Sequence, residues 1–378
     1  MNYFFIIGIC CCCAFIIYFS CCCVASVRVN AANIYFPMLL LAIGMASLAF
    51  CLKPTDLSAD LNRHFFSYEN LSGENGAIVK KVTLAQNVGT GLFAWLGVIF
   101  LSIKLGSPHF IPLIMVFINY LFFAKTMRFF ARKVKITFTI LFVFLIVKVG
   151  LVSWFHEFSG LRNTTAFAIL TYALFLGFDD WKKNKKVIIF FELLAVFIHP
   201  SSWIVALLFF LQRVIRHKKI LYFILMVWSF FSLLVAKLLT IIPLSSIKYI
   251  ATKITKYYGF GADRALEWRI YLVSLVFVII MFFHLIFIKK NKVHKSNFEK
   301  KYNEYIFLIC CFLIGSFYIP TMLMRFTYLL GFMFLPLLVQ SFRDSRKDMN
   351  SFFVLSEVFL CSLMCAYNYV ALTSHMYL

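Results

Sequence analysis

The stretch that decides the fold class spans residues 161–202 and reads LRNTTAFAILTYALFLGFDD, then WKKNKK, then VIIFFELLAVFIHPSS. Its two apolar runs, 163–180 and 187–199, are separated by a short turn with four lysines, Lys182, Lys183, Lys185 and Lys186. Apolar runs joined by a short, lysine-rich turn are typical of consecutive membrane helices whose connection faces the cytoplasm. This stretch predicts a helical membrane protein, and much of the chain repeats its pattern.

The composition extends this prediction to the whole chain. Of 378 residues, 63% are apolar and 14% are charged, a combination that is not found in soluble globular domains. At about 20 apolar residues per crossing, this content is enough for roughly twelve helices. The predicted fold class is all-α: a polytopic integral membrane protein with about 12 transmembrane helices in a single domain over residues 1–378. The expected segments are 3–27, 33–52, 88–105, 109–127, 136–155, 163–180, 187–199, 201–216, 220–242, 270–288, 305–323, 326–341 and 352–373.

The charge and the cysteines have membrane interpretations as well. A formal charge of +22 would suit a nucleic-acid-binding protein if the chain were soluble. Here the basic residues gather at the ends of apolar segments, so we expect membrane lipids, and no nucleic acid, as partners. The twelve cysteines lie inside apolar runs, without the histidine spacing of a zinc site. We interpret them as small apolar residues rather than a disulfide framework.

Five basic blocks set the expected orientation: 125–135, 182–186, 213–219, 289–301 and 343–347. We expect all five to face the cytoplasm, which leaves 156–162, 199–202, 243–269 and a turn around Met324 and Arg325 on the outside. The polar stretch 53–82 is cytoplasmic if segment 88–105 crosses the membrane. Because its cations are balanced by carboxylates, we favour an external stretch, with 88–105 as a re-entrant or interfacial helix.

Ionisable groups at membrane depth are costly unless they are paired or hydrated, and so mark candidate functional residues. One very short external turn carries His156, Glu157 and Arg162. Arg162 is either an interfacial residue that extends its charge to the headgroups or a guanidinium that faces an anionic ligand. His199 ends a helix at the same face and is either a helix–helix hydrogen-bonding residue or part of a polar site.

Two further candidates lie nearer the C-terminus. The loop 243–269 ends in four charged residues, Asp263, Arg264, Glu267 and Arg269. Asp263 and Glu267 are four residues apart, so a helical turn would place both carboxylates on one face, either as a solvated salt-bridged turn or as part of a site. Arg325 is a single charge between two apolar runs and needs a partner or water.

Several catalytic signatures are missing from the sequence. It contains no Walker A loop, no GxSxG and no HExxH. These absences count against an ATP-driven pump, a serine hydrolase and a zinc protease. The lack of an external Asp-x-Asp after the first helix also weakens a metal-dependent glycosyltransferase.

Taken together, the candidate positions resemble the EpsG and Wzy-type bacterial polysaccharide polymerases. The resemblance rests on residues 160–168, where Arg162 begins a helix, on the lysine turn 182–186, and on residues 195–202, which end in Phe-Ile-His-Pro-Ser-Ser. Asp60 with Tyr68, and Arg325 within Met-Arg-Phe, are further matches. The chain departs from the family at Asn163, where Gln is common, and the Gly-x-Asp-x-x-x-Tyr pattern is loose around Asp60.

The resemblance implies glycosyl transfer at the outer face of the bacterial inner membrane, in O-antigen or capsule biosynthesis. The implied donor is a growing glycan on polyprenyl pyrophosphate, and the acceptor is the terminal sugar of an incoming lipid-linked repeat unit. A chain-length regulator is an implied protein partner, and we expect no cofactor and no metal. The candidate alternatives are a flippase for the same lipid-linked saccharide, an O-antigen ligase and an acyltransferase.

The resemblance also implies roles for the candidate residues. Cations stabilise the leaving pyrophosphate, and these are Arg162 and Arg325, with Arg264 or Arg269. A base takes the proton of the acceptor hydroxyl, and the candidates are His199, Glu157 and Glu267. The remaining candidates for substrate binding are Asp263, Asp60, Tyr68 and His156.

Overall fold

Residues 161–202 form a helical hairpin. The helical residues of α9 (Leu161–Ile198) are interrupted at Asp180, whose backbone is extended (φ −146°, ψ 97°). A straight helix of 38 residues would be about 57 Å long. Yet Asn163 Oδ1 and Ser201 Oγ, near its two ends, are 3.2 Å apart. The chain therefore reverses direction at Asp180, in agreement with two predicted helices on either side of the lysine turn.

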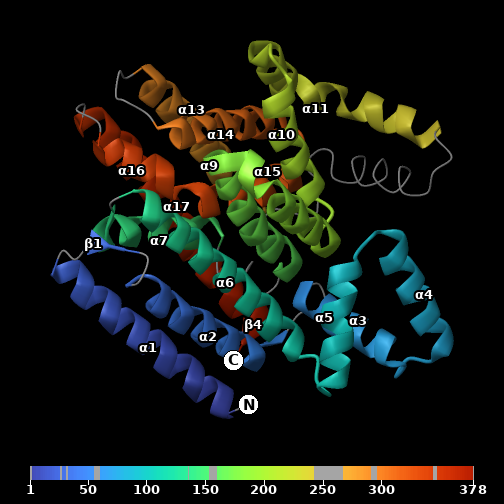
Figure 1. The fold of residues 1–378 in the computed structure, drawn as a ribbon. Helices are drawn as coiled ribbons and strands as arrows, with labels where there is room; N and C mark the ends of the chain where they lie inside the picture. Colours follow the sequence, from blue (N-terminus) through green and yellow to red (C-terminus); the bar gives the residue numbers. More distant parts are fainter. Residues whose placement is uncertain are drawn as a thin grey trace.

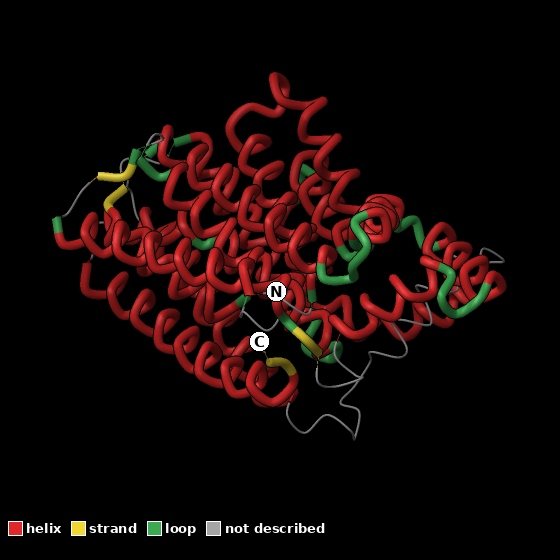
Figure 2. The backbone as a smooth tube through the Cα atoms, turned by 90° about the horizontal axis from the view of Figure 1, so that it is seen from below, coloured by secondary structure: helices red, strands yellow, loops and turns green. Residues whose placement is uncertain are grey.

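The computed structural model describes residues 2–25, 28–30, 33–54, 60–134, 136–152, 160–241, 267–290, 296–343 and 347–377. This part is almost entirely helical (Figure 2), which confirms the predicted all-α class. Besides α9, the helices are α1 (Asn2–Val24), α2 (Tyr35–Cys51), α3 (Asp60–Ser72), α4 (Ala77–Gly89), α5 (Phe93–Lys104), α6 (Phe110–Lys133), α7 (Phe138–Leu151), α10 (Ser202–Val214), α11 (Lys218–Ile241), α13 (Glu267–Lys290), α14 (Asn297–Gly315), α15 (Pro320–Met333), α16 (Leu335–Arg343) and α17 (Lys347–His375). Two short antiparallel pairs join β1 (Arg28–Val29) to β3 (Ile136–Thr137) and β2 (Lys53–Pro54) to β4 (Met376–Tyr377).

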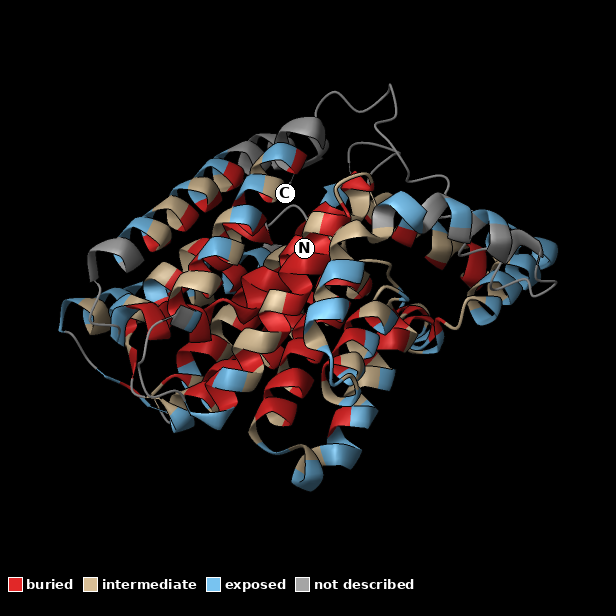
Figure 3. Ribbon diagram, turned by 90° about the horizontal axis from the view of Figure 1, so that it is seen from above, coloured by how far each residue is buried: buried red, intermediate tan, exposed pale blue. Residues whose placement is uncertain are grey.

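The helices pack around one apolar core, and the outer faces are apolar as well. Figure 3 shows buried residues concentrated in the middle of the bundle and exposed ones at its periphery. Helix α1 lies at that periphery, and its isoleucines are exposed, as expected for a face in contact with lipid. All twelve cysteines lie in the described residues and none forms a disulfide, in agreement with their interpretation as apolar residues.

Four described helices are long and apolar enough to cross a membrane: Tyr3–Val24, Phe110–Lys133, Leu161–Ile198 and Tyr271–Lys289. Helices α15 and α16, bent by 54°, make a fifth span if they are counted as one. This number is smaller than the predicted twelve or so, partly because α9 counts once although it folds into two arms. Other apolar helices are shorter, such as α7 with 14 residues and α10 with 13. The chain is a helical membrane protein.

The predicted cytoplasmic blocks meet at one end of the bundle, which we call the basic end. Contacts between the blocks and the turn of the hairpin show this: Lys133 pairs with Asp179 (2.9 Å), Arg213 donates to the carbonyl oxygen of Gly177 (2.9 Å), Lys301 donates to that of Phe178 (3.1 Å), Lys218 pairs with Glu304, and Arg343 pairs with Glu299. The blocks therefore lie on the same side, as the positive-inside rule requires.

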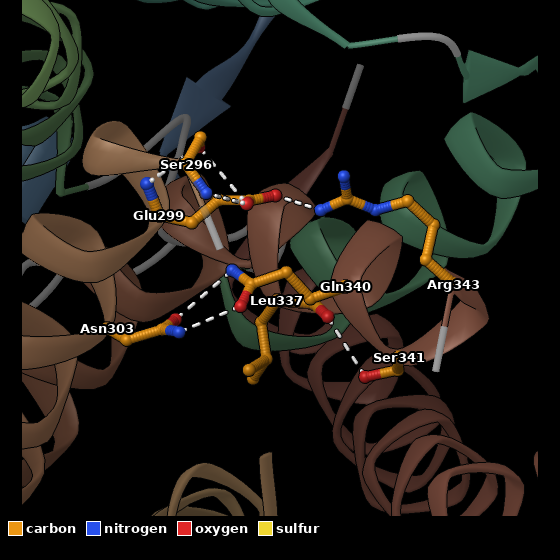
Figure 4. Close-up of polar contacts among 7 residues, drawn as sticks. All are labelled: Ser296, Glu299, Asn303, Leu337, Gln340, Ser341 and Arg343. Atoms are coloured by element: carbon orange, nitrogen blue, oxygen red, sulfur yellow. Dashed lines mark hydrogen bonds and ion pairs between the residues drawn. The ribbon is translucent and has the colours of Figure 1, made fainter. Parts of the chain in front are cut away.

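Hydrogen bonds and an ion pair also connect α14 to α16 at this end (Figure 4). A capping box starts α14: the Ser296 hydroxyl accepts from the Glu299 N–H (3.3 Å), and the Glu299 carboxylate accepts from the Ser296 N–H (2.9 Å). The same carboxylate binds Arg343 of α16. One turn further along, Asn303 and Gln340 exchange two hydrogen bonds of 2.7 and 3.1 Å. The contacts tie α14 to α16.

A buried polar group joins three more helices nearby. His284 of α13 lies between Glu357 of α17, 3.0 Å from Nδ1, and Ser341 of α16, 2.8 Å from Nε2. His284 and Glu357 are completely buried. The imidazole also stacks on Phe353, with 5.0 Å between ring centroids. The hydrogen bonds fix the register of α13, α16 and α17 at a depth where unsatisfied polar groups are costly.

Residues 60–105 lie at the end of the bundle opposite the basic end. The rings of Phe50 in α2 and His109 before α6 are 5.6 Å apart, so the chain leaves and re-enters the bundle at the same place. Helices α3, α4 and α5 lie together there (Figure 1). The 12 residues of α5 rise about 18 Å, less than the roughly 30 Å of a bilayer core. This agrees with the predicted segment 88–105 that does not cross, although the helices α3 and α4 were not predicted.

The predicted turn around Met324 and Arg325 is wrong. The break between α14 and α15 lies at residues 316–319, and α15 begins at Pro320. A proline is favourable at this first position because its φ is already helical and the missing N–H would have no helical partner. Arg325 consequently lies in the second turn of α15 rather than in a loop.

Candidate functional site

The open end of the hairpin gathers polar residues from both of its arms. Arg162 and Asn163 begin α9, and His199 and Ser201 follow its last residue. The Ser201 hydroxyl lies 2.6 Å from His199 Nδ1 and 3.2 Å from Asn163 Oδ1. The residue after His199 is Pro200, which favours extended backbone at His199 (φ −147°, ψ 124°) and so ends the helix there. This end lies opposite the turn that joins the basic end.

The module of α3 to α5 closes over this end of the hairpin. Trp95 of α5 is buried, and the Arg162 guanidinium lies over its ring, 5.3 Å from the centroid. His64 of α3, also buried, packs against the same indole with 4.6 Å between ring centroids. Stacking on the indole face fixes the direction of the guanidinium plane. Trp95 is therefore the platform that orients Arg162.

Helix α15 brings a second guanidinium to the same place. It packs against α9, with 5.5 Å between the rings of Phe326 and Phe167, and Arg325 precedes Phe326. Burial, followed by the charges of Arg162 and Arg325, holds the pKa of His199 well below its ordinary value. The packing of α15 against α9 brings the helix that carries Arg325 beside the helix that ends before His199.

We call this group the hairpin site and define it by seven residues: His64, Trp95, Arg162, Asn163, His199, Ser201 and Arg325. Three of them were predicted as site residues from the sequence, and the structure brings all three together. They come from distant parts of the chain, and hydrogen bonds, ring contacts and charge effects connect them. The site offers guanidinium, amide, imidazole and hydroxyl groups, which suit an oxyanion such as a phosphate.

Asp60 and Tyr68 lie on the helix that supplies His64. The three residues are spaced four apart, and so share one face of α3. Asp60 forms an ion pair with Arg63 of the same helix (3.0 Å), and both side chains are largely exposed. Tyr68 is buried, and burial followed by the charge of Glu74 raises the pKa of its phenol. Both residues border the hairpin site through α3.

Several predicted residues lie outside the described part of the chain. These are His156, Glu157, Asp263 and Arg264. Glu267 and Arg269 begin α13, but their side chains lie outside the described part as well. Their predicted roles stay predictions.

Sequence reasoning did not identify His64 and Trp95. His64 is one polar residue in a polar stretch, and Trp95 lies in an apolar run, so neither has a local signal of its own. The spacing of His64 four residues after Asp60 is the one sequence feature that pointed to its face of α3. Among the described residues, no group of three His, Cys, Asp or Glu side chains is arranged to hold a metal ion.

Comparison with known families matches the EpsG family over residues 62–377, a region that includes every residue of the hairpin site. No curated protein matches the chain. No solved structure matches it either. Because the match covers most of the chain, from α3 to β4, the protein belongs to the EpsG family, a family of polysaccharide-polymerase-like membrane enzymes.

Proposed function

We propose that this protein polymerises repeat units of a bacterial surface polysaccharide, in O-antigen or capsule biosynthesis. It transfers a growing glycan from polyprenyl pyrophosphate to the terminal sugar of an incoming lipid-linked repeat unit. The reaction takes place at the outer face of the inner membrane. The observation that carries this proposal is the set of contacts at the end opposite the basic end: Arg162 lies over Trp95, Ser201 connects His199 to Asn163, and α15, which carries Arg325, packs against α9.

The chemistry explains why such a site needs cations. In the transfer, the bond between the anomeric carbon of the donor glycan and the pyrophosphate oxygen breaks. A new bond forms between that carbon and the acceptor hydroxyl oxygen, and the hydroxyl proton passes to a base. Negative charge develops on the departing polyprenyl pyrophosphate. Two guanidinium groups held in place stabilise that charge without a metal ion, because each can bind two phosphate oxygens at once.

The surroundings of Arg162 support its role as a pre-oriented group. A long arginine side chain loses rotational freedom when it binds a ligand. Arg162 already lies over Trp95, 5.3 Å from the ring centroid, and Trp95 is itself buried against His64. Part of the ordering cost is therefore met in the folded protein, before the substrate binds.

The location of the site supports the proposed side of the membrane. The basic blocks gather at the other end of the bundle, and such blocks remain in the cytoplasm. A site at the opposite end faces the compartment where lipid-linked repeat units are joined. Asp60 and Tyr68 share the face of α3 that carries His64, and we propose that they contact the sugars of the substrates.

The deletion phenotype distinguishes this function from its alternatives. A strain that lacks the protein should display surface glycan of a single repeat unit, and the gene supplied in trans should restore the full ladder of chain lengths. Lipid-linked repeat units trapped in the cytoplasmic leaflet would instead indicate a flippase. Long chains that remain unattached to their final acceptor would indicate a ligase. Either of these two results would overturn the proposal.

A further inference from the structure

The elements around the hairpin site differ in how far other helices cover them. The first arm of α9, residues 161–178, is buried along most of its length, and so is α15. The second arm, residues 187–198, has an exposed apolar face, where Phe190 is 60% exposed and Leu193 40%. The hairpin site is therefore enclosed by protein on the side of the first arm and α15, and it reaches the lipid-facing surface on the side of the second arm.

Helix α5 has two faces with different contacts. On one face, Trp95 is buried and supports the Arg162 guanidinium. Phe93 lies two residues earlier, on nearly the opposite side of the helix, and is half exposed. One turn further along that side, Gly97 is exposed, and a Cβ atom added to it would meet no heavy atom of the described part of the chain within 4 Å. Helix α5 thus holds Arg162 with one face and presents an open, apolar face to the outside of the bundle.

The exposed faces of α5 and of the second arm meet beside the hairpin site. The rings of Phe93 and Phe197 are in edge contact, with 5.5 Å between their centroids. Phe190, Leu193 and Phe197 are spaced three and four residues apart, so they share one face of the second arm. This face runs from the contact toward the basic end. We call the combined surface the apolar stripe and define it by Phe93, Gly97, Phe190, Leu193 and Phe197.

A lipid-linked saccharide has two parts that need different surroundings. Its pyrophosphate requires cations and hydrogen-bond donors, whereas its polyprenyl chain is hydrocarbon and is most stable in the bilayer. The chain is bonded directly to the pyrophosphate, so it must begin beside the bound phosphates. A pyrophosphate at Arg162 therefore needs a neighbouring apolar surface that is open to lipid. The apolar stripe meets this requirement, because α5 carries both Trp95 under Arg162 and the exposed ring of Phe93.

We propose that the apolar stripe binds the first isoprene units of the polyprenyl chain of the lipid-linked donor. This inference rests on the proposed function for its substrate. The donor enters the hairpin site laterally from the outer leaflet, its chain lies along α5 and the second arm of α9, and its pyrophosphate points inward to Arg162. The open space at Gly97 accommodates the chain. Because the chain takes no part in the reaction, its contacts are the same in the ground state and the transition state, and they affect KM rather than kcat.

Kinetics of chain growth in proteoliposomes test this division. We expect Phe93→Ala and Phe197→Ala each to raise the apparent KM for a polyprenyl-pyrophosphate-linked repeat unit roughly five- to tenfold, because each removes apolar contact area, and to leave kcat within about twofold. Gly97→Trp, which fills the open space without displacing a described residue, should also raise KM. The matched control is Phe223→Ala, which removes a 67% exposed ring of α11. An unchanged KM in Phe93→Ala and Gly97→Trp, or an equal rise in the control, would overturn the inference.

Photochemical labelling keeps this inference separate from the proposed function. The full-length protein in lipid nanodiscs would be given polyprenyl pyrophosphate without sugar, with a diazirine in the isoprene units next to the pyrophosphate. We expect labelling of residues 93–101 and 187–198 that excess unlabelled polyprenyl pyrophosphate removes and the corresponding polyprenyl alcohol does not. Labelling that persists under this competition, or that is confined to other helices, would mean that the stripe is an ordinary lipid-facing surface. Competed labelling of the stripe in a protein that forms no glycan chains would support this inference and overturn the proposed function.

Discussion

The two ends of the bundle both carry cations, but these cations meet different partners. At the basic end, Lys133 meets the carboxylate of Asp179 (2.9 Å), and Arg343 meets that of Glu299. At the hairpin site, Arg162 lies over an indole face, and its charge acts on His199 together with that of Arg325. The first arrangement neutralises charge within the protein and connects helices. The second gathers positive charge around an imidazole, as a site for an anion requires.

The role of a charged side chain in a membrane protein therefore follows from the groups that it contacts. The arginines at both ends precede or follow apolar runs and look alike in sequence. We expect changes at the basic end to lower stability and leave the chemistry of the folded protein intact. We expect changes at the hairpin site to lower activity and leave folding intact. Substitutions at each end test this expected difference.

The largest effect is expected for Arg325. Arg325→Ala removes one of the two guanidinium groups proposed to stabilise the leaving pyrophosphate. It should lower the rate of polymerisation about 100- to 1,000-fold. Arg325→Lys should retain part of the activity, because it keeps the charge but not the paired hydrogen bonds. Each variant would be expressed in a strain that lacks the protein, and the length distribution of its surface glycan measured. A wild-type ladder from stably inserted Arg325→Ala would remove this residue from the site.

Glu357 lies near the basic end, where we expect a substitution to lower stability and leave activity unchanged. Glu357→Ala leaves the buried imidazole of His284 without its carboxylate, and breaking such a pair costs about 3 kcal/mol of unfolding free energy. Denaturation in detergent measures this loss, with Leu355→Ala on the exposed face of the same helix as the control. The activity of the variant per folded molecule should be unchanged. Normal stability with lost polymerisation would reverse the proposed contrast.

A smaller effect is expected at the platform of Arg162. Trp95→Leu removes the aromatic face under the guanidinium, a contact worth about 1 kcal/mol, and should reduce the rate of chain growth roughly fivefold. Trp95→Phe should lose less because a ring face remains. Measured initial rates in proteoliposomes test this order. Equal rates for both variants would mean that stacking does not orient Arg162.

The smallest effect is a dependence of stability on pH. The folded pKa of His199 is lowered from an ordinary value of 6.5, so the unfolded chain binds a proton that the folded protein does not. Above that value both states are neutral at this residue. As the pH falls below it, the unfolded state gains the proton first and stability decreases. His199→Gln should remove this part of the decrease, as measured by thermal unfolding at several pH values. An identical pH profile for the variant would contradict the lowered pKa.

Sequence patterns predicted the features that depend on neighbouring residues. The lysine turn between two apolar runs correctly indicated the hairpin. Because a hairpin returns the chain to its starting side, it also indicated that Arg162 and His199 lie close together. The clustering of the basic blocks followed from one general rule of membrane insertion. Arg325 was predicted in a turn but lies within α15, and its role in the site stays a prediction.

Features created by tertiary packing were beyond these patterns. Trp95 contacts both Arg162 and His64, and more than 60 positions of sequence separate Trp95 from Arg162. The pairing of His284 with Glu357 likewise joins residues 73 positions apart. Each of these residues lies in a segment without a distinctive sequence pattern. Its partner is determined only by how the helices pack. The helices α3 and α4 were missed because polar, charge-balanced residues give no membrane signal.

The central claim is that the hairpin site, and not the basic end, carries out glycan transfer. The most direct measurement compares Arg162→Ala with Arg128→Ala, an exposed arginine of α6 that lies over Tyr35, in purified protein given a polyprenyl-pyrophosphate-linked repeat unit. We predict a full ladder of products from Arg128→Ala and at most a single addition from Arg162→Ala, with both variants equally folded. A full ladder from Arg162→Ala would contradict the account.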